Sequence, residues 1–204
     1  MNLKWFYWYY QSAIPSKICD DILEYGLSQE KQMALTGEAD DPSEEELKNI
    51  QKKRKSDVVW MSDVWIYREI QPYIHKANSD AGWNFQWDFT EACQFTEYKK
   101  GQYYDWHNDS AIEPYDIPDE PARNGKIRKL SMTLHLTDPE EYEGGDLEFG
   151  FHDMDGNKQP NICEEIRPKG SVIVFPSFIW HRVKPVTKGI RHSLVCWNLG
   201  QPYV

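Results

Sequence analysis

The segment YYDWHNDS carries a histidine and an aspartate two residues apart, His107 and Asp109. On an extended segment, residues i and i+2 point to the same side, so this imidazole and this carboxylate can face one point. Two neutral imidazoles and one carboxylate on one face of an octahedron form a non-haem Fe(II) site, which leaves three positions open. The pair therefore indicates two thirds of a metal site or an ordinary polar turn, and a distant third ligand would decide between them.

His181 is the strongest candidate for that third ligand. It lies shortly after an apolar, strand-like run that ends at Phe175 and Pro176. The other histidines occupy a helical region, a strand, a turn-rich hairpin and a position directly after an arginine: His75, His135, His152 and His192. We expect His107, Asp109 and His181 to bind the metal.

Arg191 follows His181 on what reads as the next strand. A guanidinium group binds a carboxylate through two parallel hydrogen bonds. If the metal binds a 2-oxo acid at one end, a second carboxylate would need a cation deeper in the barrel, and Arg191 can supply it. The alternative is an ordinary, partly buried arginine.

The first third of the chain carries helical signals. In IPSKICDDILEYG we expect a helix with Ser16 as its N-cap and Gly26 as its stop. In PSEEELKNIQKKRK, Ser43 and Glu46 have the spacing of a capping box. VWIYREIQPYIHKANSDAG reads as a third helix, in which an early Pro72 is tolerated.

From residue 83 onward the pattern changes to short runs with period-2 alternation or β-branched residues. The runs are NFQWDF, EACQFTEY, KLSMTLHLT, GDLEFG and GSVIVFP, and turn residues separate them. This pattern is typical of an antiparallel β-sandwich or barrel. We expect a single domain over 1–204, with a helical support region at 1–82 and a β core at 83–204.

The composition excludes several classes of protein. The formal net charge of −10 argues against an overall nucleic-acid-binding surface, so a nucleic-acid partner is unlikely. The basic run KKRK (52–55) leaves a local basic site open, but we interpret it as a solvated helix face. Four scattered cysteines without a CxxC pattern are typical of reduced thiols. With no signal peptide and no membrane span in the sequence, we expect a cytoplasmic protein without a membrane partner.

The pattern YKKGQYYDWHND…RKLSMTLHLTDPEEYEGGDLEF…KGSVIVFPSFIWHRVKPVTKGIRHSLVCW closely resembles the Fe(II)/2-oxoglutarate-dependent dioxygenases. The prolyl 4-hydroxylase-like branch, which includes the bacterial PKHD-type hydroxylases, is the most similar. The resemblance covers roughly residues 95–197, half the chain, and its HxD…His…Arg order is specific. It implies a double-stranded β-helix, or jelly roll, with N-terminal helices that buttress one sheet.

By position, the resemblance implies a role for each matching residue. His107, Asp109 and His181 match the iron ligands. Arg191 matches the residue that holds the distal carboxylate of 2-oxoglutarate. Tyr98 and Trp197 match residues of the cosubstrate pocket.

The sequence departs from the family at His135, where relatives often have tyrosine. Ser131, Thr133 and His135 share one strand face, which we expect to be the inner one, so Thr133 and His135 are further candidates for the cosubstrate pocket. The family tyrosine donates a hydrogen bond toward the cosubstrate, and His135 could replace it with a pH-sensitive contact. The alternative is a core histidine satisfied by a neighbour.

The resemblance also implies a reaction. The cofactors would be Fe(II), with 2-oxoglutarate and O2 as cosubstrates and ascorbate as reductant. An unactivated C–H would be hydroxylated, most simply on a prolyl or other residue of a protein or peptide. A free amino acid or small metabolite is the alternative substrate, and a catalytically silent binding module on the same fold is the alternative of another class. The sequence does not indicate an oligomeric state.

One long loop fits this reaction. Residues 110–126, SAIEPYDIPDEPARNGK, are rich in proline and leave the expected metal site directly after Asp109. Loops of this length inside a compact domain are often functional. We predict that it closes over the substrate, with Tyr115 or Ile117 in contact, and the alternative is a mobile loop that never touches substrate.

Overall fold

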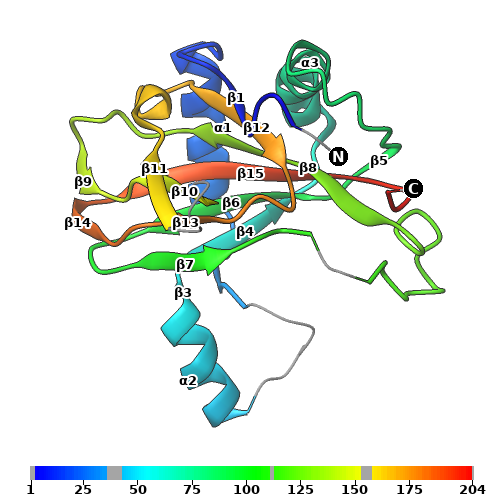
Figure 1. Ribbon diagram of the computed structural model, residues 1–204. Coiled ribbons are helices and arrows are strands. Elements are labelled where there is room, and N and C mark those ends of the chain that lie inside the picture. The colour runs from blue at the N-terminus through cyan, green and yellow to red at the C-terminus, as the bar shows by residue number, and fades with distance from the viewer. Residues whose placement is uncertain (1–2, 36–42, 111–112, 153–157, 204) are drawn as a thin grey trace.

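The computed structural model describes residues 3–35, 43–110, 113–152 and 158–203. In this part of the chain, two antiparallel sheets face each other and two helices cover the outer face of the larger one (Figure 1). This confirms the mostly β, jelly-roll fold with buttressing N-terminal helices.

The larger sheet has the order β1-β12-β8-β15-β6-β4-β2, and β5 pairs with β15 outside this path. Its strands are β1 (Trp8–Tyr10), β2 (Gln32–Met33), β4 (Asp57–Met61), β5 (Phe89–Thr90), β6 (Cys93–Tyr98), β8 (Ile127–His135), β12 (Val172–Pro176) and β15 (Arg191–Gly200). The smaller sheet has the order β11-β10-β13-β7-β3. Its strands are β3 (Arg54–Lys55), β7 (Tyr103–His107), β10 (Leu147–His152), β11 (Lys158–Ile162) and β13 (His181–Val183). A separate pair consists of β9 (Tyr142–Gly144) and β14 (Val186–Gly189).

The helices occupy two different places. The two longer ones, α1 (Ser16–Ser28) and α3 (Val64–Asp80), lie against the larger sheet, whereas α2 (Glu44–Lys53) projects from the opposite side, beside β3 (Figure 1). A single 3-10 turn, η1 (Glu164–Ile166), precedes β12. No helix in the described ranges has the length and apolar character that a membrane span requires.

Strand alternation divides the interior into two cores. On β8, Leu130, Met132 and Leu134 point toward α1 and α3 and pack in the core beneath the helices. The intervening residues face the smaller sheet, where Phe149 and Phe175 belong to a second core. Because the alternation puts polar residues of β8 on this inner face, the space between the sheets becomes a polar cavity within an apolar frame.

The capping box of α2 is confirmed, because the Ser43 hydroxyl accepts from the backbone N–H of Glu46 and the Glu46 carboxylate accepts from that of Ser43.

Two expectations about α1 were wrong. Pro15, not Ser16, is the N-cap, and its carbonyl accepts from the backbone N–H groups of Ile18 and Cys19. Gly26 lies inside the helix, where a Cβ atom would come within 2.6 Å of the Phe95 ring. Gly26 therefore allows close helix–sheet packing and does not end the helix.

Four of the five predicted β runs contain a strand within a few residues of the expected position: β6, β8, β10 and β12. The fifth, NFQWDF, was wrong for residues 84–88. The Asn78 side chain holds the backbone of Phe85, and the N–H of Asp88 donates to the carbonyl of Leu199. The segment is fixed by these single bonds and not by a continuous ladder. The division at residue 83 stays a prediction, and residues before it supply β1 to β4 as well as the helices.

Candidate metal centre

The three predicted metal ligands converge between the sheets. His107 ends β7 and His181 begins β13, and the two residues are directly paired across the antiparallel strands. The Nε2 atoms of His107 and His181 each lie 3.6 Å from an oxygen of the Asp109 carboxylate. One ligand atom from each residue lies within 4.8 Å of the others. In the described part of the chain, this is the cluster that could hold a metal ion.

Backbone carbonyls orient both imidazoles. The Nδ1 atom of His107 lies 2.7 Å from the carbonyl oxygen of Asp105, and that of His181 lies 2.9 Å from the carbonyl oxygen of Ile179. A carbonyl can only accept, so each Nδ1 carries a proton and donates it. The Nε2 lone pairs are then free to face the shared centre, which is the arrangement that a metal-binding histidine requires.

The Asp109 carboxylate is fixed from the other side. Its Oδ2 atom accepts a hydrogen bond of 2.7 Å from the hydroxyl of Ser131 on β8, and the Ser131 oxygen accepts in turn from Ser177 at 2.9 Å. The backbone N–H of Asp109 donates to the carbonyl of Ser177. A strand of the larger sheet, β8, and the turn that follows β12 therefore hold a ligand that follows a strand of the smaller sheet.

The protonation of the site suits a divalent cation. Burial and, after it, the neighbouring His181 ring lower the pKa of His107 to about 3, and Asp109 opposes this shift only in part. Burial alone would raise the pKa of the Asp109 carboxyl, but His181, His107 and Arg128 together bring it down to about 2. His107 is thus neutral and Asp109 ionised near neutral pH, so the donor set fits Fe(II) without loss of a proton.

Arg191 provides an uncompensated cation in the same cavity. Its side chain is 1% exposed, and its guanidinium donates to the Ser193 hydroxyl at 3.3 Å and to the Nε2 atom of His135 at 2.8 Å. Its Nε atom has no partner among the described residues. Gly145 leaves room for this side chain, because a Cβ there would lie 2.9 Å from Cδ of Arg191. A buried guanidinium with only neutral partners fits a ligand carboxylate.

The structure brings most of the predicted pocket residues into this cavity. Tyr98, Thr133 and Trp197 line it together with the three metal ligands and Arg191. His135 does not line it but lies behind Arg191. Its Nε2 atom accepts a hydrogen bond from the guanidinium, so this nitrogen faces Arg191 and not the cosubstrate pocket. Burial, followed by the Arg191 charge, lowers the pKa of His135 well below its usual value.

Sequence reasoning missed a charged pair beside Trp197, one of the residues that line the cavity. The Arg128 guanidinium lies 4.0 Å from the ring of Trp197 and donates to the Glu91 carboxylate at 2.6 Å. Glu91 also faces Arg123, at 3.3 Å, and accepts from the Tyr115 hydroxyl. Strict alternation would place Arg128 with Leu130 and Met132 on the helix side of β8, and a register shift between Asn198 and Leu199 breaks this alternation, so the sequence held no signal for the pair.

Our interpretation of the basic run KKRK was wrong for one of its residues. Lys52, Lys53 and Lys55 are exposed, but Arg54 is 5% exposed and lines the cavity of the metal ligands. The cause is a change of structure within the run, because α2 ends at Lys53 and Arg54 begins β3, which pairs with β7. The solvated helix face therefore ends at Lys53, and Arg54 is not part of it.

The loop from residue 110 to 126 is attached to Glu91 through Tyr115 and Arg123. Its Ile112 lies outside the described residues. Tyr115 and Lys126 close the base, because the N–H of Tyr115 donates to the carbonyl of Lys126 and the N–H of Gly125 to that of Tyr115. Arg123 lies 4.7 Å from the Tyr115 ring and bonds to Glu91, which connects the loop to Arg128 and Trp197. Whether the loop closes over substrate stays a prediction.

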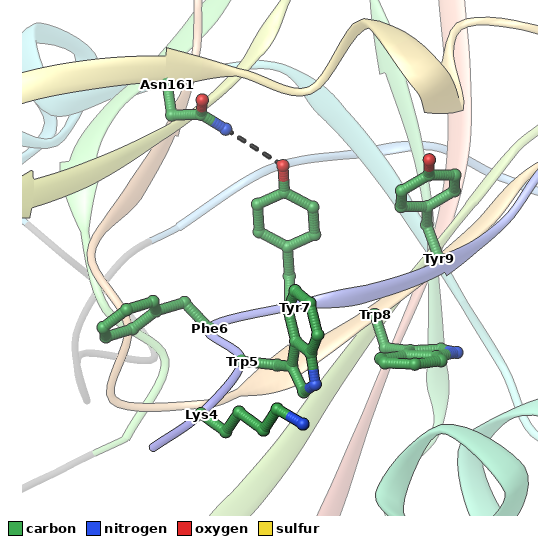
Figure 2. A pocket seen from close by; sticks show the side chains of 7 residues that line it. All are labelled: Lys4, Trp5, Phe6, Tyr7, Trp8, Tyr9 and Asn161. Atoms are coloured by element: carbon green, nitrogen blue, oxygen red, sulfur yellow. Dashed lines mark hydrogen bonds between the residues drawn. The ribbon is translucent and has the colours of Figure 1, made fainter. Parts of the chain in front are cut away.

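A larger hollow lies outside the metal centre. This groove of about 680 Å³ is lined mainly by aromatic residues next to β1 (Figure 2): Lys4, Trp5, Phe6, Tyr7, Trp8, Tyr9 and Asn161. Tyr7 points toward Asn161, which donates to its hydroxyl at 3.0 Å, and its ring stacks on Phe149. The Phe149 ring centre lies 6.2 Å from that of His181. The wall of the groove thus supports the metal centre from behind but adds no metal ligand.

Comparison with known families gives one match over about half the chain. Residues 93–198 match the model of the 2OG-Fe(II) oxygenase superfamily. This segment runs from the start of β6 almost to the end of β15 and contains the three metal ligands and Arg191.

Among curated proteins, several PKHD-type hydroxylases are similar. One from Xylella fastidiosa (strain M23) is 33% identical over 104 residues, which cover 51% of this chain and 42% of the relative. One from Alteromonas mediterranea is 39% identical over 106 residues, which cover 50% of this chain and 41% of the relative. The match thus spans less than half the length of each relative.

Solved structures match over almost the whole chain. A viral collagen prolyl hydroxylase from Paramecium Bursaria Chlorella virus-1, in a 2OG complex, has a TM-score of 0.63 at 18% identity and covers 97% of each chain. A Pseudomonas putida prolyl-4-hydroxylase has a TM-score of 0.65 at 17% identity and covers 98% of this chain and 95% of its own. At such identities the likeness shows the jelly-roll fold.

Proposed function

Since the chain belongs to the 2OG-Fe(II) oxygenase superfamily, we propose that it is an Fe(II)- and 2-oxoglutarate-dependent dioxygenase that hydroxylates an unactivated C–H. The observation that carries this proposal is the convergence of His107, Asp109 and His181 in the cavity that also holds the uncompensated guanidinium of Arg191. The reaction would convert 2-oxoglutarate, O2 and the substrate C–H into succinate, CO2 and the hydroxylated product.

Each residue would have a distinct task. His107, Asp109 and His181 would hold Fe(II), which supplies the activation of O2 when bound. Arg191 would bind the distal carboxylate of 2-oxoglutarate, while Tyr98 and Thr133 border its chain. Ser131 would keep Asp109 in its ligating orientation through its hydrogen bond of 2.7 Å. The acceptor nitrogen of His135 would keep the Arg191 guanidinium in place.

We propose a prolyl or other residue of a protein or peptide as the substrate. Solved structures of similar fold include a collagen prolyl hydroxylase and a Trichoplax adhaerens prolyl hydroxylase in complex with a hypoxia inducible factor peptide fragment. Trp197 lines the cavity and the Arg128 guanidinium lies 4.0 Å from the centre of its ring, so an aromatic face backed by a cation borders the space that a substrate side chain would enter. A free amino acid or small metabolite is the alternative substrate.

A catalytically silent binding module would not need this site. A module that has lost catalysis has no requirement for three oriented ligands, yet both imidazoles and the carboxylate keep their supporting hydrogen bonds. The complete set therefore favours an enzyme.

The proposal is tested by the formation of succinate. The protein is incubated with Fe(II), ascorbate and 2-oxoglutarate, with and without proline-containing peptides, and the peptides are then analysed by mass spectrometry. We expect succinate in every iron-containing sample and a gain of one oxygen atom on a stimulating peptide. Absence of succinate under all conditions would contradict the proposed reaction.

A further inference from the structure

Arg54 introduces a second buried cation into the metal cavity. Charged side chains that line this cavity are Asp109, Arg191 and Arg54. Arg54 lies outside the segment that matches the superfamily, and it reaches the cavity because β3 pairs with β7, where it lies directly opposite Tyr104.

The contacts of Arg54 leave part of its guanidinium without a partner. Its Nε atom donates to the Ser56 hydroxyl at 3.0 Å and its Nη1 atom to the Gln94 side-chain oxygen at 3.4 Å. The guanidinium carbon lies 4.6 Å from the centre of the Tyr104 ring, which stacks on His107. The Nη2 atom is buried and has no hydrogen-bond partner in the described part of the chain.

No carboxylate of the described residues forms an ion pair with Arg54. Arg128 differs, since it is paired with Glu91. A buried cation with only neutral partners is costly unless an anion joins it. Arg54 is therefore prepared for an anionic ligand group.

Charge balance indicates which ligand brings that group. The metal centre holds one anionic ligand, Asp109, so a bound divalent cation leaves one positive charge, and Arg191 adds another. The dianion 2-oxoglutarate neutralises both. The charge of Arg54 then remains unmatched in the loaded cavity.

We infer that Arg54 binds a carboxylate of the substrate that is hydroxylated. This inference rests on the proposed function and narrows its substrate class. The carboxylate has two possible sources, namely an acidic side chain beside the target residue of a peptide, or the free carboxylate of an amino acid or C-terminal residue. A guanidinium recognises both sources through the same paired hydrogen bonds.

The test uses full-length protein loaded with Mn(II) and 2-oxoglutarate, so that binding is measured by calorimetry without turnover. Two acid–amide pairs serve as probes: N-acetyl-Glu-Pro-amide against N-acetyl-Gln-Pro-amide, and N-acetylproline against N-acetylprolinamide. The variants are Arg54→Gln, which keeps hydrogen-bonding capacity without charge, and Arg54→Lys, which keeps the charge. Lys55→Gln is the matched control, because Lys55 is the exposed neighbour on the same strand. Circular dichroism melting verifies the fold of each variant.

We expect the wild type to bind the acid of one pair at least about thirtyfold more tightly than the matching amide. Removing one partner of a buried charge pair lowers the affinity by at least this factor. The pair that shows the preference identifies the source of the carboxylate. Arg54→Gln should abolish the preference, Arg54→Lys should keep part of it, and Lys55→Gln should leave it unchanged.

Three outcomes would overturn the inference. The first is equal or unmeasurable binding of acids and amides by the wild type. The second is a preference that survives Arg54→Gln. The third is a loss of 2-oxoglutarate affinity in Arg54→Gln, measured in a separate titration, which would assign the carboxylate to the cosubstrate. A failure of the proposed function would differ from all of these, because it would appear as absent succinate formation in the iron-loaded protein.

Discussion

At the scale of single residues, hydrogen bonds orient all three metal ligands toward one point. His107 and His181 each donate one ring proton to a backbone carbonyl, and Ser131 holds the carboxylate of Asp109. Because these supports come from the backbone and from a neighbouring strand, removing one ligand side chain leaves the others in position. The site should thus lose its metal without losing its fold.

We predict that His107→Ala, Asp109→Ala and His181→Ala each weaken Fe(II) binding by orders of magnitude. A facial triad with two ligands cannot hold the ion as it does with three. Anaerobic titration with Fe(II) measures the affinity, and circular dichroism melting verifies the fold. Ser110→Ala, next to the site, serves as a control that leaves all three ligand groups intact. Wild-type affinity in His181→Ala would show that this residue is not a ligand.

A second residue-scale prediction concerns the cosubstrate. Arg191→Ala should raise the apparent KM for 2-oxoglutarate by a factor of about thirty to several thousand, because losing one partner of a buried charged hydrogen bond costs roughly 2–5 kcal/mol. Fe(II) affinity should change far less, since the metal ligands keep their supports. Steady-state kinetics at varied 2-oxoglutarate, with exposed Lys188→Ala as the control, measures the effect. An unchanged KM in Arg191→Ala would contradict its role.

The residues that sequence reasoning could identify are those whose type and order are specific together. An HxD pair, a later histidine and a following arginine define a chemistry, and the structure places all four in one cavity. Sequence reasoning missed Arg54 because the run KKRK shows which residues are charged but not which of them is buried. Its position depends on the pairing of β3 with β7, in which Arg54 lies opposite Tyr104, a residue 50 positions further along the chain.

At the scale of elements, Gly26 controls how closely α1 approaches the sheet. We predict that Gly26→Ala destabilises the protein by about 1–3 kcal/mol, the usual cost of overpacking, because the added Cβ would come within 2.6 Å of the Phe95 ring. Glycine to alanine inside an exposed part of a helix would instead stabilise it. Urea unfolding of Gly26→Ala measures the change.

The control for this experiment is Glu24→Ala on an exposed position of the same helix, where the free energy of unfolding should change little. Gly26→Ala combined with Phe95→Leu should recover part of the loss, because the ring that clashes is removed. A stabilised Gly26→Ala protein would show that the helix does not pack on β6 in this way.

The loop from residue 110 to 126 gives a second prediction at this scale. Its base is closed by the backbone bonds of Tyr115 with Gly125 and Lys126, so residues 116–124 can be replaced by a short turn without opening it. We predict that this variant keeps Fe(II) and 2-oxoglutarate binding but forms succinate without an equal amount of hydroxylated product, because closure over the substrate excludes water and side reactions.

The ratio of succinate to hydroxylated product measures this coupling. Tyr115→Phe, with the loop at full length, separates the effect of the hydroxyl bond to Glu91 from that of the loop itself. A wild-type ratio in the shortened protein would show that the loop is not a lid.

Local sequence signals predicted an element correctly where the residues of that element alone determine it. The capping box of Ser43 and Glu46 defined the start of α2, alternation located β8, and β-branched residues located β12. Signals failed where tertiary contacts decide. Gly26 resembled a stop signal but serves packing against Phe95, and residues 84–88 resembled a strand but are fixed by Asn78 and Leu199.

At the scale of the whole molecule, one sheet serves two cores. The residues of β8 that point outward pack beneath α1 and α3, and those that point inward reach the metal cavity. The helices thus stabilise the sheet that holds Ser131, while the smaller sheet supplies His107 and His181 (Figure 1). The sequence could predict both layers but not their register, which determines that the ligands meet.

The central claim is that this cavity is an Fe(II) and 2-oxoglutarate site that performs oxidative decarboxylation. The most direct measurement is the release of succinate from 2-oxoglutarate by purified protein in air with Fe(II) and ascorbate, compared between the wild type and Asp109→Ala, which lacks the anionic ligand. We predict succinate from the iron-loaded wild type and only background amounts from Asp109→Ala or from metal-free wild type. Equal succinate from Asp109→Ala and the wild type would contradict the claim.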